Sequence, residues 1–414
     1  MRLTSLAALT ALLTPLVCAS AATADPLTFD AALKLAQQSA PSLQAKAADV
    51  TAARSASVAA GRLPDPKLRF GVENFPVSGP PAGSFTADSM TMATIGVMQD
   101  MPNGAKRKAE HLKASADIDL ASANASVETR DVRLNTALAW VDLYYAKQKL
   151  AALDEAQRAI TSIGTTAPSQ LAAGAIRPAQ SLEADQLNAE LADRRADLVA
   201  DVARARAELV RWTGDEDADV AGDPPEFVVN AGDLRAGLDH NPSLMSLGAM
   251  TQQANADVAL ARADKRPDWG WDVTYQHRDP RWGDMVSTGV TISLPLFSKS
   301  RQDPVIDAKT AQVTRARLDQ DAAHRQLRAQ LDADLADHVM HHDRLIRART
   351  TFVPLAEKKV QLETASYGAG TASLSDVQQA QLALVEARID VLSREADVVR
   401  DGVRINLTYG SNGQ

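Results

Sequence analysis

Two patterns of hydrophobic and polar positions alternate along this chain. From Trp269 onward, apolar and small or polar residues take turns at every second position, and this period predicts a β-strand. The residues on the apolar face are Trp269, Trp271, Val273 and Tyr275. The stretch from Met285 to Leu294 repeats the alternation. Together the two stretches predict a β-hairpin at about 268–296.

A second hairpin is predicted at about 66–101, where Leu68, Phe70 and Val72 alternate with polar or small residues before a loop rich in Gly, Pro and Ser. One apolar face and one small, polar face are typical of membrane-barrel strands. Aromatic rings favour the membrane interface, so four are expected there: Phe70, Trp269, Trp271 and Tyr275. Two hairpins packed on a soluble core are the alternative. Four strands cannot close a membrane barrel, so several chains would have to share one.

After each hairpin the chain has a helical pattern. Ala105 to about Ser162 contains neither proline nor glycine, and Arg301 to about Tyr367 contains only Pro304 and Pro354. At ~1.5 Å per residue, the first stretch predicts a rod of about 87 Å. A helix of that length must bury its apolar seam against other helices. The pattern therefore predicts a helical bundle or tube.

The order of elements occurs twice. Helix, hairpin, long helix, turn and helix fill 25–213, with a turn at about 163–175, and again 231–414, with a turn at about 367–372. The acidic, proline-containing segment 214–230 is interpreted as a linker. The expected fold class is mainly α with a small β part and an internal two-fold repeat.

The first residues indicate export from the cytoplasm. A basic Arg2, an apolar run and Ala22-Thr23-Ala24 predict a secretory signal peptide over 1–24. Lipidation at Cys18, the only cysteine, is the alternative. The formal net charge of −8, without basic runs, argues against a nucleic-acid partner.

Three stretches carry a resemblance to a known family: "PLTFDAALKLAQQSAPSLQAKAADVTAARSASVAAG", "LAAGAIRPAQSLEADQ" and "YGAGTASLSDVQQAQLAL". In this order and spacing, the chain resembles the TolC-like outer-membrane efflux proteins. Its brief strands, the Pro102-Asn103-Gly104 turn and the short loops look most similar to the branch serving heavy-metal resistance-nodulation-division pumps. The resemblance implies a homotrimer in outer-membrane lipid. Each chain would give four strands to a twelve-stranded transmembrane barrel, and its helices would extend a periplasmic tunnel.

The resemblance also implies partners and site residues. The trimer would dock on a periplasmic adaptor (membrane fusion protein) and an inner-membrane resistance-nodulation-division pump, with no catalysis and no cofactor. The residues matching adaptor-docking tips are Leu171, Ala173, Gly174, Ala175, Ile176, Ala369, Gly370, Thr371 and Leu374. Glu183 and Asp376 are candidates for a carboxylate ring at the aperture of the tunnel. Alternatively, Asp376 simply favours a helix N-terminus.

One cluster has metal-binding spacing. His338, His341 and His342 share a helix face, where imidazoles can bind zinc or copper, although a solvated face is the more common reason for such a pattern. No phosphate-binding loop or catalytic triad can be recognised in the sequence, so no enzymatic activity is expected.

The leading functional hypothesis is an outer-membrane duct of a tripartite efflux system that exports heavy-metal cations. The alternatives are a multidrug efflux duct, a type I protein-secretion duct, or, in another class, a periplasmic coiled-coil scaffold without a pore.

Overall fold

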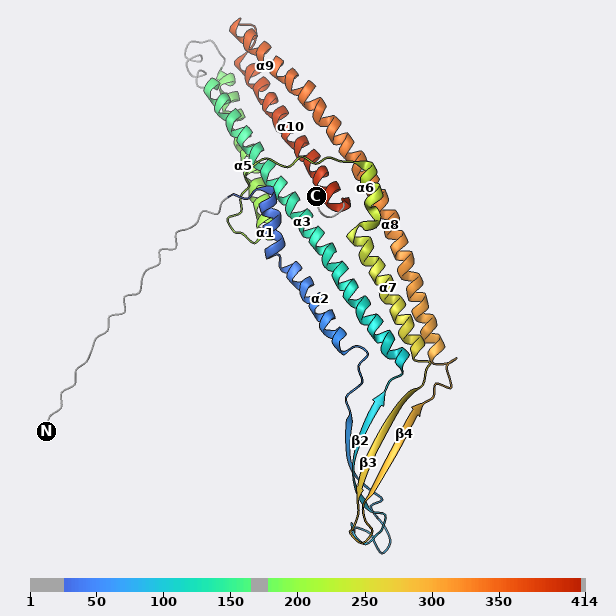
Figure 1. Ribbon diagram of the computed structural model, residues 1–414. Helices are drawn as coiled ribbons and strands as arrows, with labels where there is room; N and C mark the ends of the chain where they lie inside the picture. Colours follow the sequence, from blue (N-terminus) through green and yellow to red (C-terminus); the bar gives the residue numbers. More distant parts are fainter. Residues whose placement is uncertain (1–25, 165–177, 411–414) are drawn as a thin grey trace, which may run out of the picture.

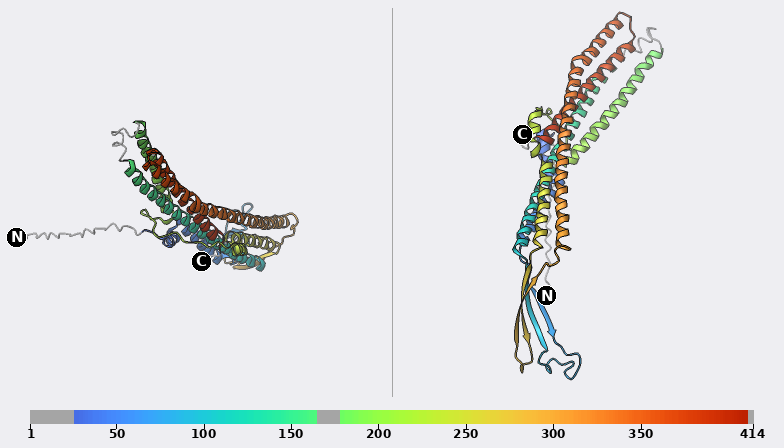
Figure 2. Two further views of the ribbon diagram at one scale, coloured as in Figure 1. Left: turned by 90° about the horizontal axis from the view of Figure 1, so that it is seen from above. Right: turned by 90° about the vertical axis from the view of Figure 1, so that its right-hand side faces the viewer.

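The computed structural model describes residues 26–164 and 178–410. The predicted signal peptide, Cys18 and the predicted tip residues Leu171 to Ile176 lie outside this part of the chain. The molecule is elongated, with a β-sheet at one end and helix ends at the other, as Figure 1 and both views in Figure 2 show. None of the described helices is long and apolar enough to span a membrane.

The helices of the first half lie on either side of a β-hairpin. Pro41 begins α2 and ends α1, because the residue before a proline avoids helical backbone angles. Helix α3 runs without interruption for 61 residues. The bounds are α1 (Phe29–Ser39), α2 (Pro41–Ala59), α3 (Gly104–Gly164) and α5 (Pro178–Thr213).

The second half repeats this arrangement with one difference in its long helix. Pro354 lacks an amide hydrogen and would clash with the carbonyl of the preceding turn, and a π-helical turn, η2, lies directly before it. The bounds are α6 (Ala231–Gly237), η1 (Leu238–His240), α7 (Pro242–Ala263), α8 (Gln302–Arg347), η2 (Ala348–Phe352), α9 (Val353–Gly368) and α10 (Leu374–Tyr409).

The two hairpins join into one four-stranded antiparallel sheet in the order β1-β2-β3-β4. The strands are β1 (Lys67–Glu73), β2 (Met92–Met101), β3 (Asp268–His277) and β4 (Met285–Ser293). Central pairing of β2 with β3 links the two halves of the chain, and Ile95 lies opposite Tyr275. The predicted fold class, long helices with a small four-stranded β part, is confirmed.

The two faces of the sheet differ in side-chain size. One face exposes apolar residues from every strand, including Phe70 at 68% and Val290 at 69% exposure. On the other face, the glycines leave little room for a larger side chain. A Cβ added at Gly96 would lie 2.6 Å from Thr274 Oγ1, and a Cβ added at Gly289 would lie 2.4 Å from Asp272 Oδ1. The polar face is therefore closely packed, while the apolar face has no cover within the described chain.

The helices form a wall in which α3 is the common member. Toward the sheet, α3 packs against α2 and α7, and α7 packs against α8. Toward the helix ends, α3 packs against α5 and α10, and α10 packs against α9. The short helices α1 and α6 and the C-terminal end of α10 lie about midway along the long axis of the molecule (Figure 1).

Candidate channel wall and helix tip

The turn between α9 and α10 is a predicted tip that the structure describes fully. Gly370 has a φ of 75°, a left-handed conformation that glycine adopts without a Cβ clash. Ser373 then caps α10: its hydroxyl accepts from the Asp376 amide, and the Asp376 carboxylate accepts from the Ser373 amide at 2.8 Å. This capping box fixes where the second helix of the hairpin begins.

The predicted docking residues of this turn differ in exposure. Ala369, Gly370 and Thr371 are exposed. Leu374 is only 7% exposed, so it offers little apolar surface in a single chain, and its role in docking stays a prediction. As the first residue of α10, Leu374 turns into its own helical hairpin. The other predicted tip residues, Leu171, Ala173, Gly174, Ala175 and Ile176, lie outside the described residues.

The two candidate aperture carboxylates are both exposed, Glu183 on α5 and Asp376 on α10. Hydrogen bonds from the Ser373 hydroxyl and amide lower the pKa of Asp376. Its carboxylate is therefore charged at neutral pH, and as the third residue of α10, within the capping box, it also stabilises the helix N-terminus, which was the alternative role. A charge at the aperture and a cap are compatible roles for the same group.

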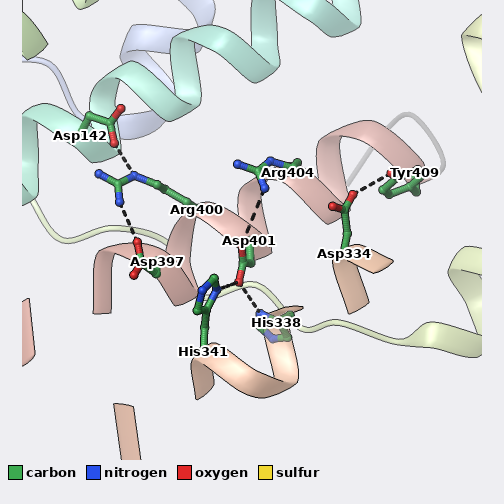
Figure 3. A network of polar contacts seen from close by, with 9 residues as sticks. All are labelled: Asp142, Asp334, His338, His341, Asp397, Arg400, Asp401, Arg404 and Tyr409. Atoms are coloured by element: carbon green, nitrogen blue, oxygen red, sulfur yellow. Dashed lines mark hydrogen bonds and ion pairs between the residues drawn. The ribbon is translucent and has the colours of Figure 1, made fainter. Parts of the chain in front are cut away.

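Two histidines of the predicted metal cluster face a carboxylate on α10, and the third does not. His341 Nδ1 lies 2.7 Å from Asp401 Oδ2 on α10, and His338 Nδ1 lies 4.0 Å from the same oxygen (Figure 3). His342 is exposed. Over residues 26–164 and 178–410, no group of three or more His, Cys, Asp or Glu side chains is arranged to hold a metal ion. The geometry indicates a contact between helices α8 and α10.

Polar contacts of α10 with its neighbours continue on both sides of Asp401 (Figure 3). Arg400 donates to Asp142 of α3 at 2.5 Å and to Asp397 at 3.0 Å. The Tyr409 hydroxyl donates to Asp334 of α8 at 2.7 Å, and burial together with this carboxylate raises the tyrosine pKa. Helix α10 is thus connected by charged groups to α3 and to α8 at the middle of the wall.

The predicted interface aromatics lie on the exposed apolar face of the sheet. Trp269 and Trp271 are at the end of β3 that follows α7, whereas Tyr275 is near the hairpin loop. Phe70, Ile95, Tyr275 and Val286 form one row across all four strands. The aromatic rings therefore occur toward both ends of the sheet, about two residues from each end of β3.

Two irregular segments, residues 26–28 and 214–230, form a belt that is bonded to the helices of the wall. The interpretation of 214–230 as a linker did not include these contacts. The Leu27 amide donates to the Asp219 carbonyl at 2.7 Å, and Lys147 of α3 contacts the Asp219 carboxylate at 2.7 Å. Trp140 of α3 donates its indole N–H to the Leu27 carbonyl at 2.8 Å. Phe227 and Val220, apolar residues in an otherwise acidic segment, were the available signal.

Comparison with known proteins gives a family match for part of the chain and a curated relative along most of it. A family model described as outer membrane efflux protein matches residues 234–411. The cobalt-zinc-cadmium resistance protein CzcC of Cupriavidus metallidurans is 25% identical over 391 residues, which cover 89% of this chain and 86% of that protein.

Two solved structures share the fold. A membrane protein from Pseudomonas aeruginosa superimposes with a TM-score of 0.81 at 15% identity, covering 93% of this chain and 91% of that one. The Campylobacter jejuni CmeC outer membrane channel gives a TM-score of 0.78 at 12% identity, covering 92% and 85%.

A four-stranded sheet with an exposed apolar face is continued by a wall of long helices, as in the CmeC channel. Together with the match to the outer membrane efflux protein family, this architecture indicates one protomer of an outer-membrane channel with a periplasmic helical extension. The second half of the chain matches the outer membrane efflux protein family, and the whole chain has the fold of TolC-like outer-membrane channels. Proteins of this family form trimeric channels in tripartite efflux complexes and are not enzymes. A scaffold without a pore does not fit this family.

Proposed function

We propose that this protein exports heavy-metal cations as the homotrimeric outer-membrane duct of its efflux system. The observation that carries the choice of cargo is the likeness to CzcC, a cobalt-zinc-cadmium resistance protein, over 89% of this chain. An acidic chain, with a formal net charge of −8, is consistent with a cationic cargo. A periplasmic adaptor and an inner-membrane pump of the resistance-nodulation-division type complete the proposed assembly.

The free edges of the sheet support a barrel shared between chains. Within the described residues β1 pairs only with β2, and β4 only with β3. Because every neighbouring pair is antiparallel, β1 and β4 run in opposite directions. Strand β4 of one copy can therefore pair in antiparallel fashion with β1 of the next, which leaves no open edge in the membrane. Three copies would form the twelve-stranded barrel.

The tip turns are the proposed docking surface for the adaptor. Ala369, Gly370 and Thr371 form an exposed reversal at the far end from the sheet, and Leu171 to Ile176 are the proposed counterpart in the first half. The division into two repeats, 25–213 and 231–414, joined by 214–230, is part of this proposal.

An aperture role for Asp376 can be separated from its capping role. Ser373→Ala and Asp376→Ala both remove the capping box, but only the second removes a charge. If Asp376 lines the aperture, Asp376→Ala lowers the cation selectivity of single channels in planar bilayers, while Ser373→Ala leaves it unchanged. Equal effects of the two variants would reduce Asp376 to a helix cap. Glu183→Gln provides the corresponding test on α5.

Growth of a deletion strain tests the cargo. We expect sensitivity to zinc, cobalt or cadmium, restored by the wild-type gene, with unchanged tolerance of dyes, detergents and antibiotics. Sensitivity confined to the organic compounds would contradict the metal proposal and favour a multidrug duct. Loss of a secreted protein with normal metal tolerance would favour a type I secretion duct.

A further inference from the structure

Asp401 is a carboxylate in an unusual position on helix α10. Its side chain is only 6% exposed, and an ionised carboxylate that is withdrawn from water must have partners. The closest is His341 of α8, whose Nδ1 lies 2.7 Å from Oδ2. Arg404, one turn further along α10, lies 4.0 Å from Oδ1. The charge of Asp401 is therefore stabilised mainly from the neighbouring helix.

His338 occupies the remaining space beside this carboxylate. Its Nδ1 is buried, lies 4.0 Å from Asp401 Oδ2 and has no hydrogen-bond partner within the described chain. Asp401 Oδ2 already accepts from His341, so the carboxylate is shared unequally between two imidazoles (Figure 3). An unsatisfied polar atom in the interior is costly, and it invites an explanation in terms of a second state.

The charged groups around His338 come from both helices that form the contact. Helix α10 contributes Asp401 and Arg404, while α8 contributes His341 and His342. Asp397 and Arg400 are engaged with α3, and Asp334 with Tyr409. The belt segment 214–230 reaches the same turn of α10 with an apolar group, Phe227, which lies beside Gly402.

We propose that His338, His341 and Asp401 form a proton-sensitive contact that holds α8 to α10 and weakens when His338 takes up a proton. A neutral His338 fits its buried place. A protonated His338 would be poorly solvated there, because only 19% of its side chain is exposed, and it would add a positive charge beside His341 and His342. The carboxylate that could compensate lies 4.0 Å away and is already engaged by His341.

The sign of the pH dependence follows from this arrangement. Burial lowers the pKa of His338, with Asp401 opposing and the two neighbouring histidines adding to the effect. Because the folded pKa lies below the unfolded value, the unfolded state binds the proton more readily. The stability of the contact is fully present above the unfolded pKa of about 6.5 and is lost as the pH falls from there through the folded pKa.

Hydrogen exchange read by mass spectrometry on the full-length protein tests this proposal. Amide protection of α8 around His338–His342 and of α10 around Asp401 would be compared at about pH 7.5 and about pH 5.5, with EDTA present and chemical exchange rates corrected. In the wild type we expect lower protection of both segments at the acidic pH. His338→Gln, which cannot be protonated, should remove most of this difference.

Two histidines of the same helix turn provide matched controls. His342→Gln, at an exposed position, should keep the wild-type pH dependence. His341→Gln should lower protection at both pH values, because Asp401 loses its nearest donor. If His338→Gln does not assemble, His338→Leu makes the same test with an apolar side chain.

Three results would overturn the proposal. The first is a pH dependence that persists unchanged in His338→Gln. The second is a gain in protection at the acidic pH, which would mean that protonation tightens the contact. The third is a gain in protection on adding Zn²⁺ at neutral pH without EDTA that is lost in His338→Gln, since the cluster would then be a metal site.

Discussion

Trp140 is predicted to control how firmly the belt segment is held on the wall. The side chain is fully buried in α3, its indole N–H donates to the Leu27 carbonyl at 2.8 Å, and Phe29 packs edge-on at 5.6 Å. Tyr144 stacks on the other side at 5.5 Å. Trp140 thus joins the start of the described chain to the longest helix, and Val220 and Phe227 of the belt pack against the same cluster.

Two substitutions at this position separate the hydrogen bond from the ring. Trp140→Phe removes the indole donor, while the Leu27 carbonyl still accepts from the Ala221 amide at 3.0 Å, so the cost is about 1 kcal/mol. Trp140→Ala removes the ring as well, and truncations of this kind cost about 3–5 kcal/mol. These values correspond to a population of the detached belt that is roughly 5-fold larger in Trp140→Phe and at least roughly 10²-fold larger in Trp140→Ala.

Limited proteolysis of the belt measures this opening. When reclosing is fast compared with cleavage, the rate of cutting within 214–230 follows the population of the open form. We expect the cleavage rate to rise in the order wild type, Trp140→Phe, Trp140→Ala. Trp212→Phe is the matched control, because the half-buried Trp212 donates to Glu208 of its own helix at 2.9 Å. Equal rates for Trp140→Ala and Trp140→Phe would refute the assignment of the ring as the main anchor.

Two further predictions concern the wall and the sheet. Asp257 of α7 accepts from Lys113 of α3 at 2.6 Å and from Lys309 of α8 at 3.2 Å, and although burial opposes it, these bonds lower the pKa of Asp257. Asp257→Asn should therefore cost about 1 kcal/mol of unfolding free energy at neutral pH. The difference between this variant and the wild type in thermal unfolding should shrink below about pH 4, because the wild-type carboxylate is then protonated. A difference that stays constant down to about pH 3 would contradict this account. In the sheet, a Cβ on residue 289 would lie 2.4 Å from Asp272 Oδ1, so Gly289→Val forces the Asp272 side chain to move and should lower the yield of assembled trimer. Thr291→Val on the same face of β4 should assemble normally, and equal yields of the two variants would refute the close packing of that face.

The parts of the fold that depend on local pattern could be predicted from the sequence. Alternation of apolar residues around Phe70 and Tyr275 predicts the strands because side chains in a strand point to opposite faces, and the structure places both residues in one row. Long stretches without proline or glycine predict the long helices, since few residues in them disfavour helical backbone angles. Pro354 marks an irregularity, but which turn accommodates it depends on packing against α10.

The features that depend on distant contacts could not be predicted in this way. The acidic composition of 214–230 is typical of a linker, yet Asp219 is held by Lys147, far away in the sequence. Leu374 directly follows an exposed turn in the sequence, yet its side chain is only 7% exposed, which the local pattern does not reveal. His341 is paired with Asp401, which lies 60 positions away in the sequence. The helical spacing of the histidines gives no information about this partner.

Disulfide formation between β1 and β4 tests the central claim that copies of this chain close one barrel. Cysteines would be placed on the polar face, at Arg69 or Glu73 in β1 and at Ser287 or Thr291 in β4, in a protein whose only natural cysteine is Cys18. Within one chain these strands are three strand spacings apart, roughly 14 Å, which exceeds the reach of a disulfide, ~7 Å between Cα atoms. Thr94 and Gln276 lie directly opposite each other in β2 and β3, and cysteines there control for oxidation within a chain.

The account predicts that at least one β1–β4 combination, oxidised in outer membranes, gives covalent species of two and three chains and none larger. The control pair should remain a single chain. Species no larger than one chain from every β1–β4 combination, with the control pair oxidised, would contradict the account.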